Sequence, residues 1–418
     1  MVELADIERA RSAVARIGKH TPVFNSRVLS ERLGAPVVYK AENLQRTGSF
    51  KIRGAASKLA SLGERASAGI VVASAGNHAQ AVAFAAREAG VSCEVFMPAG
   101  ASIAKYEATL SYGAEVRLGG ESIDECLEVA TAYADDQGKI LVHPFDDEAV
   151  IAGQGTLGLE LVEDVADLAA VVIPLGGGGL AGGTALGVKS LRPEVRVVAV
   201  QAADYAAWPA SLAAGRPITA EGSPTLADGI AVRRPGELTL PLIAGYVDEV
   251  VTVSEDGIAD AMVLMLERAK LVVEGAGAVG VAALLDGLDP APLRPDGTKG
   301  TTVLVLSGGN VDTGLLAPAI NRHETHAGRR LVLFARVPDR PGSLARLLSN
   351  LGQSGANLVT VDHMREGFEL HVRETALQIV LETRNPEHAS AVIEAARGAG
   401  FEVHVMGHSA SWDARSGG

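Results

Sequence analysis

The run Val171-Val-Ile-Pro-Leu-Gly-Gly-Gly-Gly-Leu-Ala-Gly-Gly183 passes from β-branched residues through four consecutive glycines into small apolar residues. This order predicts a buried strand, a glycine loop and the start of a helix. The surrounding uncharged stretch 168–188 is long enough to raise the question of a membrane span. Pro174 and the glycines 176–179, 182 and 183 interrupt it, however, and would break a helix in lipid. We therefore expect a strand–loop–helix unit inside a protein that does not enter a membrane.

The same alternation of strand and helix continues on both sides of this run, from residue 36 to about residue 310. The expected strands are Val37–Lys40, Gly69–Ala73, Cys93–Met97, Glu115–Leu118, Ala170–Ile173, Val195–Val200 and Thr302–Leu306. Helices are expected at Asn77–Ala89, Ser122–Tyr133 and Gly257–Arg268. Nearly continuous apolar strands indicate a parallel sheet buried on both faces. The predicted fold class is α/β, with a doubly wound body.

The pattern changes in the last quarter of the chain. The polar stretch 321–330 is expected to be a linker, and a smaller unit is expected over residues 331–405. Its expected elements are strands at 331–337, 356–362, 375–382 and 401–404, a helix whose apolar face carries Leu344, Leu347, Leu348 and Leu351, and a helix at 386–398. This βαββαβ order is the split ferredoxin-like pattern. Residues 406–418 are expected to form a disordered tail.

Composition excludes several classes of protein. The 418 residues are 47% apolar, and 37 basic against 50 acidic side chains give a net charge of −13. With no long Lys/Arg-rich stretch, binding to nucleic acid is not expected. Cys93 and Cys126 are expected to be reduced packing residues. The first ten residues lack the apolar stretch of a signal peptide, so we expect a cytoplasmic protein.

Two segments that follow expected strands are candidates for chemistry. Lys51 comes after Phe50 at the expected start of an Ala-rich helix. The helix N-terminus and Arg53 would favour its neutral, nucleophilic amine, whereas the alternative is an ordinary solvated lysine. Ser74-Ala-Gly-Asn-His-Ala-Gln80 opens another helix. Its N–H groups and Asn77 can bind a carboxylate or phosphate, unless Ser and Asn serve there only as an N-cap.

Three further positions fit a phosphate-bearing ligand. The glycines 176–179 can point several N–H groups at one phosphate. A dinucleotide loop is the competing interpretation, but strand 195–200 ends in Gln201 and no acid stands there for a ribose. Ser307, after the last expected strand, can meet a ring nitrogen or belong to a plain turn. Glu274 lies among small apolar residues, where it needs either an ion pair or a role in the site.

Together these segments resemble the threonine/serine dehydratases, which are pyridoxal-phosphate enzymes of fold type II with a tryptophan-synthase-β-like body. The resemblance covers about residues 5–320 and runs through KAENLQRTGSFKIRGA, SAGNHAQ, PLGGGGLAGG, TLADGIAVRRPGELT, VVEGAGAVG and VLSGGN. It implies that residues 1–320 form a catalytic domain of two open parallel-sheet subdomains. In residues 331–405, DRPGSLARLL and ANLVTVDHMR resemble an ACT domain, which would respond to an amino-acid effector.

The resemblance also implies roles for individual residues. Lys51 would form the Schiff base with pyridoxal 5'-phosphate and carry the catalytic step. Cofactor contacts would come from Phe50 beside the ring, Asn77 at the ring hydroxyl, Gly176, Gly177, Gly178, Gly179 and Leu180 at the phosphate, and Ser307 at the pyridine nitrogen. The substrate carboxylate would be bound by Ser74, Ala75, Gly76, Asn77 and His78. The effector would contact the turn formed by Asp339, Arg340, Pro341, Gly342 and Ser343.

The implied reaction is β-elimination of L-threonine to 2-oxobutyrate and ammonia, with L-serine giving pyruvate. Ala75 stands where serine racemases of this family carry a second serine, so racemisation is disfavoured. Gln201 and Ala207 replace the acids of cation-binding members, so no metal site is expected. A homodimer or homotetramer is expected. The alternatives are a serine dehydratase or racemase, and a catalytically silent amino-acid sensor. The sequence does not decide between isoleucine biosynthesis and threonine catabolism.

Overall fold

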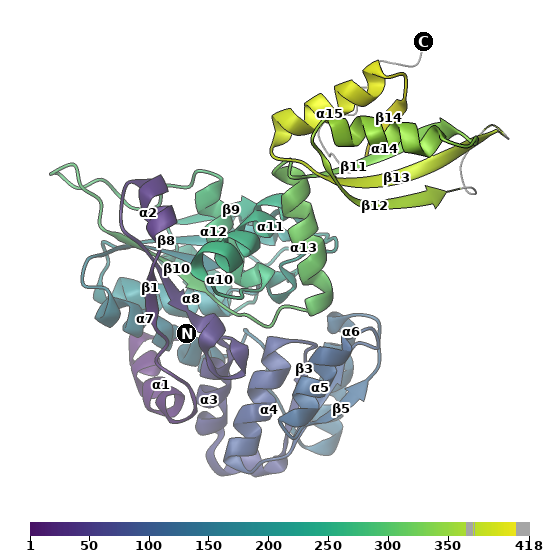
Figure 1. Cartoon of the computed structure of the whole chain (residues 1–418). Helices are drawn as coiled ribbons and strands as arrows, with labels where there is room; N and C mark the ends of the chain where they lie inside the picture. Colours follow the sequence, from purple (N-terminus) through teal and green to yellow (C-terminus); the bar gives the residue numbers. More distant parts are fainter. Residues whose placement is uncertain (365–370, 372, 407–418) are drawn as a thin grey trace. The chain divides into compact units, whose positions relative to one another are not determined.

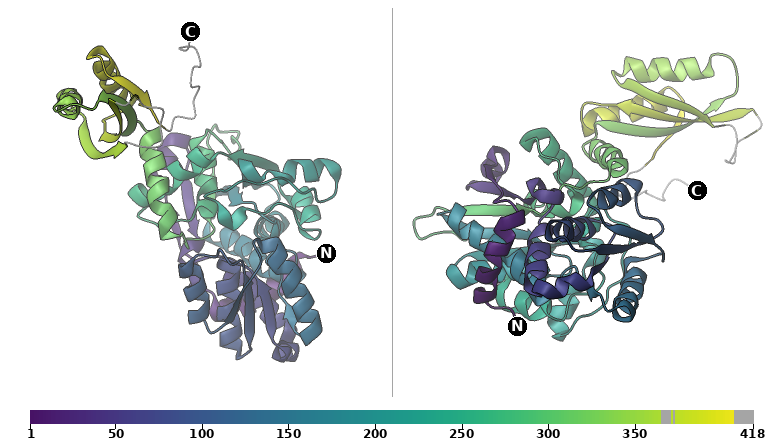
Figure 2. Two further views of the ribbon diagram at one scale, coloured as in Figure 1. Left: turned by 90° about the vertical axis from the view of Figure 1, so that its right-hand side faces the viewer. Right: turned by 90° about the horizontal axis from the view of Figure 1, so that it is seen from below.

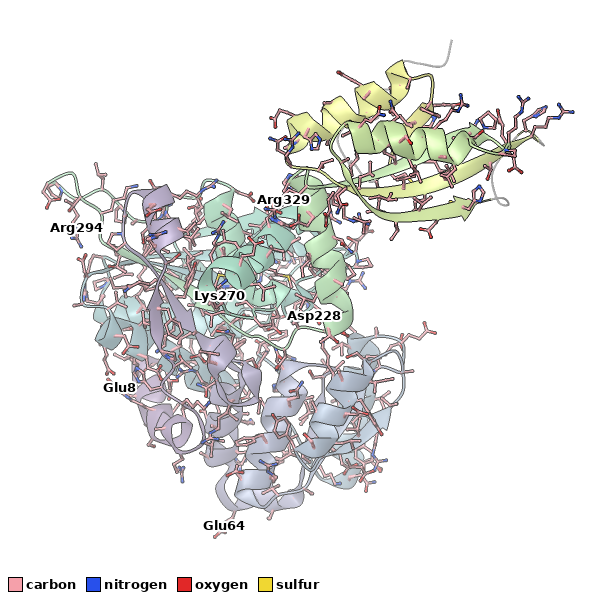
Figure 3. All side chains as sticks on the ribbon, viewed as in Figure 1. Glu8, Glu64, Asp228, Lys270, Arg294 and Arg329 are labelled. Carbon is pink, nitrogen blue, oxygen red and sulfur yellow. The ribbon has the colours of Figure 1, made fainter. Side chains whose placement is uncertain are left out.

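The chain divides into two compact units, Met1–Leu316 and Ala317–Gly418 (Figure 1). The computed structural model describes residues 1–364, 371 and 373–406, so the expected tail lies outside the described residues from 407 onward. Each unit has an apolar core of its own. The charged residues Glu8, Glu64 and Arg294 point outward from the larger unit (Figure 3). No helix in the described ranges is both long and apolar enough to cross a membrane.

The larger unit contains two sheets, of which the first has the strand order β1-β2-β10-β7-β8-β9. All its neighbours pair in parallel except β1, which is antiparallel to β2. The strands are β1 (Val23–Asn25), β2 (Val37–Ala41), β7 (Leu168–Pro174), β8 (Arg196–Ala202), β9 (Glu249–Val253) and β10 (Thr301–Leu306). The helices in this part of the larger unit are α1 (Leu4–Ile17), α2 (Arg27–Leu33), α7 (Glu148–Asp164), α8 (Gly179–Leu191), α9 (Ala207–Ala214), α10 (Thr239–Tyr246), α11 (Glu255–Leu264) and α12 (Gly275–Leu285).

The second sheet is entirely parallel, in the order β5-β4-β3-β6, and helices flank both of its sides (Figure 2). Its strands are β3 (Ile70–Ala73), β4 (Cys93–Met97), β5 (Glu115–Leu118) and β6 (Ile140–Leu141). Its helices are α3 (Lys51–Leu62), α4 (Asn77–Ala89), α5 (Ile103–Ser111) and α6 (Ile123–Gln137). The expected α/β class with parallel sheets is confirmed.

Short helical turns join these elements. They are η1 (Glu42–Leu44), η2 (Arg46–Gly48), η3 (Gly63–Ala68), η4 (Ala203–Tyr205), η5 (Asp228–Ile230) and the π-helical turn η6 (Met265–Ala269). The helix expected to run to Arg268 therefore changes to π geometry after Leu264. Strands β1, β6 and β9 were not expected, because two of them are only two or three residues long and β9 is a half-exposed edge strand.

Glycines let α7 and α8 approach each other closely behind the glycine loop. A Cβ on Gly158 would lie 2.5 Å from the carbonyl oxygen of Thr184, and one on Gly183 would lie 2.5 Å from that of Ile151. Real side chains do not tolerate such distances, so these positions need glycine. The close packing fixes the first turn of α8 relative to α7.

The carboxyl ends of the central strands meet at one edge of each sheet. In the first sheet, β10 lies between β2 and β7. Parallel pairing brings together the loops 42–50, 307–310 and 175–178 that follow these strands. In the second sheet, β3 and β6 are neighbours, and loops 74–76 and 142–147 follow them. Open α/β sheets bind ligands at this kind of edge.

The smaller unit is an antiparallel sheet with two helices. Its elements are β11 (Arg330–Pro338), α14 (Ser343–Gln353), β12 (Asn357–Met364), β13 (Glu374–Glu382), α15 (Pro386–Gly398) and β14 (Glu402–Val405), and the sheet order is β12-β13-β11-β14. The expected βαββαβ order is present. Leu347 and Leu351 are buried in its core, and Leu344 and Leu348 pack against it.

The stretch 321–330, which is expected to be a linker, is mostly helical. Helix α13 (Thr313–His326) runs through most of it, and β11 begins at Arg330. Arg329 forms an ion pair of 2.6 Å with Glu324 and helps to order the last turn. A polar stretch is equally compatible with a loop and with a solvated helix, so composition alone could not separate the two.

Candidate active site

Lys51 is the first residue of α3, and it follows a turn in which Thr47 and Gly48 both have positive φ. Its Nζ donates a hydrogen bond of 2.8 Å to the carbonyl oxygen of Pro144 and lies 5.2 Å from the centre of the Phe50 ring. Among the described residues, no carboxylate lies within ion-pair distance of this amine. Burial lowers the pKa of Lys51 to about 8, against an opposing effect of Glu274. A useful fraction of the amine is therefore neutral near physiological pH.

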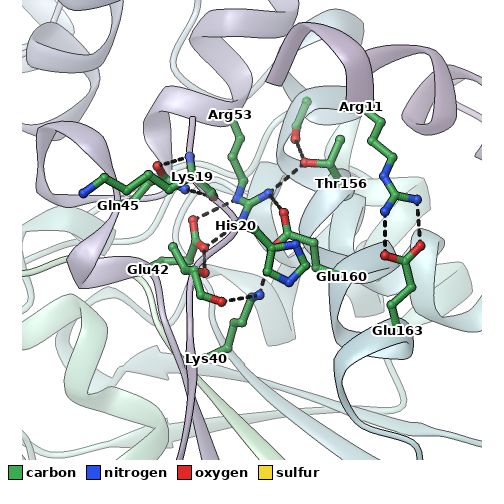
Figure 4. Close-up of polar contacts among 12 residues, drawn as sticks. Arg11, Lys19, His20, Lys40, Glu42, Gln45, Arg53, Thr156, Glu160 and Glu163 are labelled. Carbon is green, nitrogen blue, oxygen red and sulfur yellow. Dashed lines mark hydrogen bonds and ion pairs between the residues drawn. The ribbon is translucent and has the colours of Figure 1, made fainter. Parts of the chain in front are cut away.

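Arg53, two residues further along α3, is in the opposite situation (Figure 4). Its guanidinium is fully buried and holds two carboxylates, Glu42 at 2.8 Å and Glu160 at 2.7 and 2.9 Å. It also donates a hydrogen bond of 3.1 Å to Thr156. The expectation that Arg53 depresses the pKa of Lys51 is wrong, because its charge is neutralised by these acids. Burial produces the shift instead.

Lys40 extends the same buried group of charges. Its Nζ lies 2.7 Å from Glu160 and 2.8 Å from Asp164. Burial alone would raise the pKa of Glu160, but hydrogen bonds and charge from Arg53 and Lys40 lower it. His20, Glu160 and Asp164 offer ligand atoms close enough for a metal ion. The Lys40 ammonium binds two of these groups, so the cluster is an ion-pair network rather than an open metal site.

The glycine loop ends in a helix whose first N–H groups have no cap. Gly178 is the N-cap of α8, has φ +96° and supplies no side-chain hydrogen bond. Within the described residues, no backbone acceptor is bonded to the N–H of Gly178, Gly179 or Leu180. Buried, unpaired N–H groups at a helix N-terminus are suited to an anion such as phosphate.

The glycines are also required by the residues that pack beneath the loop, a reason that the sequence did not reveal. A Cβ on Gly177 would lie 2.3 Å from the Phe145 ring, and one on Gly179 would lie 2.6 Å from Oε1 of Gln154. At Gly176 it would come within 3.0 Å of Ile230. The loop therefore combines a packing requirement with an open row of N–H donors.

Helix α4 also starts without a side-chain cap, which removes the N-cap interpretation of this segment. Its N-cap is Gly76, whose own N–H is bonded to Ser74 Oγ at 3.1 Å. Asn77 is the first helical residue, and Ala75 lies in the loop before it. The His78 imidazole is 3% exposed and bonded to the carbonyl of Val142, and burial lowers its pKa to about 3. The His78 imidazole is therefore neutral, and its Nε2 is already bonded within the protein.

Glu274 belongs to this site, and it forms no ion pair with any residue that the structure describes. It is the N-cap residue of α12, and its Oε1 accepts a hydrogen bond of 2.7 Å from Asn77 Nδ2. Burial, assisted by the charge of Asp228, raises the pKa of Glu274 to about 7, while the bond from Asn77 opposes the rise. Asp228 itself pairs with Lys105 at 2.5 Å.

Ser307 lies next to the lysine segment. Its carbonyl accepts a hydrogen bond of 3.0 Å from the N–H of Phe50, whereas its hydroxyl is bonded to no described residue. The side chain is 2% exposed. Ser307 thus offers a buried, uncharged hydroxyl beside Phe50 and Lys51, as a pyridine nitrogen requires.

Sequence reasoning missed the loop between β6 and α7. Pro144 accepts the lysine hydrogen bond, and Phe145 packs on Gly177, so this loop joins the lysine to the glycine loop. Asp146 accepts hydrogen bonds from the N–H groups of Glu237 and Leu238 at 3.0 and 2.8 Å. The available signal was its position directly after a strand of a parallel sheet.

Other predicted positions lie apart from this cluster. Gln201 donates to the carbonyl of Tyr205 at 2.6 Å and accepts from the N–H of Trp208 at 3.3 Å, so its amide is already bonded. Ala207 is the first residue of α9 and is buried. The turn 339–343 belongs to the smaller unit, between β11 and α14, and Gly342 there has φ +90°.

The donor set fits pyridoxal phosphate. It combines a half-buried amine that pairs with no carboxylate in the described part of the chain, an uncapped helix start for a phosphate, and a neutral hydroxyl for a ring nitrogen. Asn77 adds an amide donor. Lys51, Phe50, Asn77, Ser307 and the loop 176–180 are the residues that would hold this group.

Comparison with known proteins gives consistent results. Residues 14–308 match the family described as pyridoxal-phosphate dependent enzymes. An L-threonine ammonia-lyase of Thermotoga maritima is 44% identical over 409 residues, which covers 97% of this chain and 100% of the relative. A catabolic L-threonine dehydratase of Escherichia coli K12 is 42% identical over 312 residues, covering 74% of this chain and 94% of the relative.

Solved structures show the same likeness. A threonine deaminase from T.th. has a TM-score of 0.68 and 41% identity, covering 74% of this chain and 99% of that one. Maize serine racemase has a TM-score of 0.71 and 34% identity, covering 78% and 98% of the two chains.

Proposed function

This chain belongs to the family of pyridoxal-phosphate-dependent enzymes, and on that premise we propose that it deaminates L-threonine to 2-oxobutyrate and ammonia by β-elimination. It is a threonine ammonia-lyase by its likeness to characterised relatives over nearly its full length. The observation that carries the proposed chemistry is the half-buried Lys51 amine, whose pKa is lowered to about 8 and which pairs with no carboxylate of the described residues.

Lys51 acts as the base in this proposal. Bound pyridoxal phosphate supplies an electron-withdrawing ring that makes the Cα proton of an amino acid acidic and allows the β-hydroxyl to leave. The neutral Nζ of Lys51 takes the Cα proton. The carbonyl of Pro144 holds Nζ in place, and because a carbonyl is only an acceptor it leaves the amine free to change its protonation state.

Other residues bind and orient the substrate and the cofactor. The N–H groups at the start of α4, with Ser74, Ala75, Gly76, Asn77 and His78, bind the substrate carboxylate. The N–H groups of residues 176–180 bind the phosphate. Ser307 presents a neutral hydroxyl to the ring nitrogen and leaves it unprotonated, which weakens the electron sink and favours loss of the β-group over transamination.

A steady-state assay tests this function. The purified chain should release 2-oxobutyrate and ammonia from L-threonine in equal amounts, and pyruvate from L-serine. One methyl group is worth only about 1–3 kcal/mol of discrimination, so both substrates should react. D-Serine should not accumulate from L-serine, because Ala75 cannot act as a base on the opposite face. Rapid racemisation with little 2-oxo acid would overturn the assignment.

The smaller unit is proposed to be an ACT domain that controls the enzyme. Supporting this, its element order and sheet order are ferredoxin-like, and the turn 339–343 contains Gly342 with φ +90° and no atom near its Cβ position. An effector that binds this turn would alter turnover by favouring one of two states.

The matched pair Gly342→Asp and Gly342→Ala tests this control. Both add a side chain at positive φ, so the alanine variant controls for the strain of losing glycine. Only aspartate adds a charge that repels an effector carboxylate. Turnover should respond to isoleucine or valine in the parent chain and in Gly342→Ala more strongly than in Gly342→Asp. An unchanged response in Gly342→Asp would refute this location for the effector.

Several finer assignments remain predictions. These are a homodimer or homotetramer, a cytoplasmic location, the absence of a bound metal ion, and a role in isoleucine biosynthesis or in threonine catabolism.

A further inference from the structure

Asn310 connects two parts of the site through one carboxamide. It follows β10 in the loop after Ser307. Its Nδ2 donates one hydrogen bond of 2.7 Å to the carbonyl of Thr47 and another of 2.8 Å to Oδ1 of Asn77. Thr47 belongs to the turn that leads into Lys51, and Asn77 opens α4. Asn310 therefore touches both the segment of the lysine and the amide next to Glu274.

Chemistry fixes the orientation of both amides. The Thr47 carbonyl can only accept a hydrogen bond, so the Asn310 atom that faces it must be Nδ2. The second hydrogen of Nδ2 then points to Asn77, and the Asn77 atom that accepts it must be Oδ1. The remaining end of the Asn77 amide, Nδ2, is thereby turned to Oε1 of Glu274 at 2.7 Å. An ionised Glu274 only accepts and selects the same orientation, but a protonated Glu274 can also donate, and then the bond from Asn310 decides which end of the Asn77 amide faces it.

The turn that Asn310 holds is under strain. Thr47 has φ 60°, a conformation that β-branched residues rarely adopt, and Gly48 has φ 75°. A Cβ on Gly48 would lie 2.2 Å from Oδ1 of Asn310, so the carboxamide packs directly on the glycine. The N–H of Gly309 also donates to the Gly48 carbonyl at 2.9 Å. Such strain persists only where neighbouring contacts enforce it.

We propose that Asn310 is a positioning residue, which makes Asn77 present its amide donor to the cofactor ring while it holds the turn before Lys51. The proposal rests on the function proposed above, in which Asn77 contacts the ring hydroxyl. The contacts that carry this role are those of Asn310 with Thr47 and Asn77. Asn310 acts through Asn77, and that dependence is what an experiment can measure.

Asn310→Asp keeps the size of the side chain but removes both donors. The aspartate accepts, so Asn77 should flip and offer Nδ2 to it, which turns Oδ1 toward Glu274 and the ring. Titration of the cofactor-free full chain with pyridoxal phosphate should show a dissociation constant raised about tenfold and a shifted visible absorption band. Asn77→Ala should cause a similar change. In the double variant, the dissociation constant should stay within about twofold of that of Asn77→Ala alone.

Asn43→Asp is the matched control. Asn43 also donates through Nδ2 to a backbone carbonyl, that of Val272 at 3.1 Å, and lies beside Gly309. The same isosteric change there should lower the melting temperature without moving the absorption band. If Asn310→Asp does not fold, Asn310→Ser, which keeps one donor, enters the same double-variant comparison.

The outcomes separate this inference from the proposed function. Effects of Asn310→Asp and Asn77→Ala that multiply in the double variant would overturn the inference, because Asn310 would then act independently of Asn77. Unchanged binding and an unchanged band in both Asn310 variants would do the same. A parent chain that neither binds pyridoxal phosphate nor deaminates threonine would overturn both.

Discussion

Lys51 and Arg53 stand two residues apart in α3, the first half-buried and the second fully buried, yet their surroundings are opposite. Arg53 is held by two carboxylates and a hydroxyl, and Lys40 joins the same group of charges through Glu160. The Lys51 amine contacts one carbonyl oxygen and one aromatic ring. The pKa of Arg53 is raised by its acids, once these outweigh the effect of burial, whereas burial lowers that of Lys51.

The two residues illustrate two uses of a charged side chain in the interior, one structural and one chemical. A buried ion that is fully paired keeps its proton and fixes the elements that carry it. A buried group that lacks a partner has a shifted pKa and can exchange its proton near neutral pH. Arg53 therefore anchors α3 to α7 and η1, and Lys51, held at the start of the same helix, is left free for the reaction.

Lys51→Ala should show the largest effect on turnover. Deamination of L-threonine should fall by at least about 10⁴-fold, since one amine provides both the covalent attachment and the proton transfer. Because no carboxylate is left unpaired, the melting temperature of the cofactor-free chain should barely change. Lys58→Ala is the control, since Lys58 lies in the same helix but pairs with Asp147.

The Lys58→Ala variant should keep most of the turnover and lose some stability. Comparable loss of turnover in both variants would break the distinction between the two kinds of lysine.

Arg53→Ala should show the largest effect on stability. It leaves Glu42 and Glu160 without their guanidinium partner in the interior, which should lower the unfolding free energy by about 3–5 kcal/mol. Arg11→Ala offers the comparison, because Arg11 pairs with Glu163 at the surface. That change should cost no more than about 1 kcal/mol. Denaturant titration of the two variants measures both values, and equal losses would contradict the account.

Glu274→Gln tests whether a buried acid that forms no ion pair with the described residues also has a shifted pKa. The folded-state pKa of about 7 lies above the ordinary value of 4.5, so between these pH values the folded chain keeps a proton that the unfolded chain has lost. The stability of the cofactor-free parent should therefore fall relative to Glu274→Gln as pH rises from about 4.5 to 7. Each unit of pKa difference corresponds to about 1.4 kcal/mol.

Unfolding measured at pH 5 and pH 7.5 tests this effect. A difference between the two chains that is independent of pH would show that Glu274 does not keep its proton in the folded state.

Much of this fold was predictable because its strands are short apolar runs that end in glycine or serine loops. Strands β4 and β5 begin and end at the predicted residues, as does helix α4. The βαββαβ order of the smaller unit followed from alternating apolar residues in β13 and the leucine face of α14.

What the sequence could not show depends on contacts between distant segments. Arg53 looked like a source of positive potential, because its partners Glu42 and Glu160 lie 11 and 107 residues away. Pro144 contributes a backbone carbonyl, which no side-chain pattern can reveal. Asn310 was visible only as part of a turn, although its amide joins Thr47 and Asn77 across more than 200 residues.

The attachment site of the cofactor shows directly whether Lys51 is the lysine that binds it. The enzyme loaded with pyridoxal phosphate is reduced with borohydride, digested, and the labelled peptide is identified by mass spectrometry. If Lys51 is the Schiff-base lysine, we expect a single label on Lys51. Lys40 and Lys58 should stay unmodified because carboxylates hold their ammonium groups. A label on either of these two paired lysines, or no covalent label at all, would contradict this assignment.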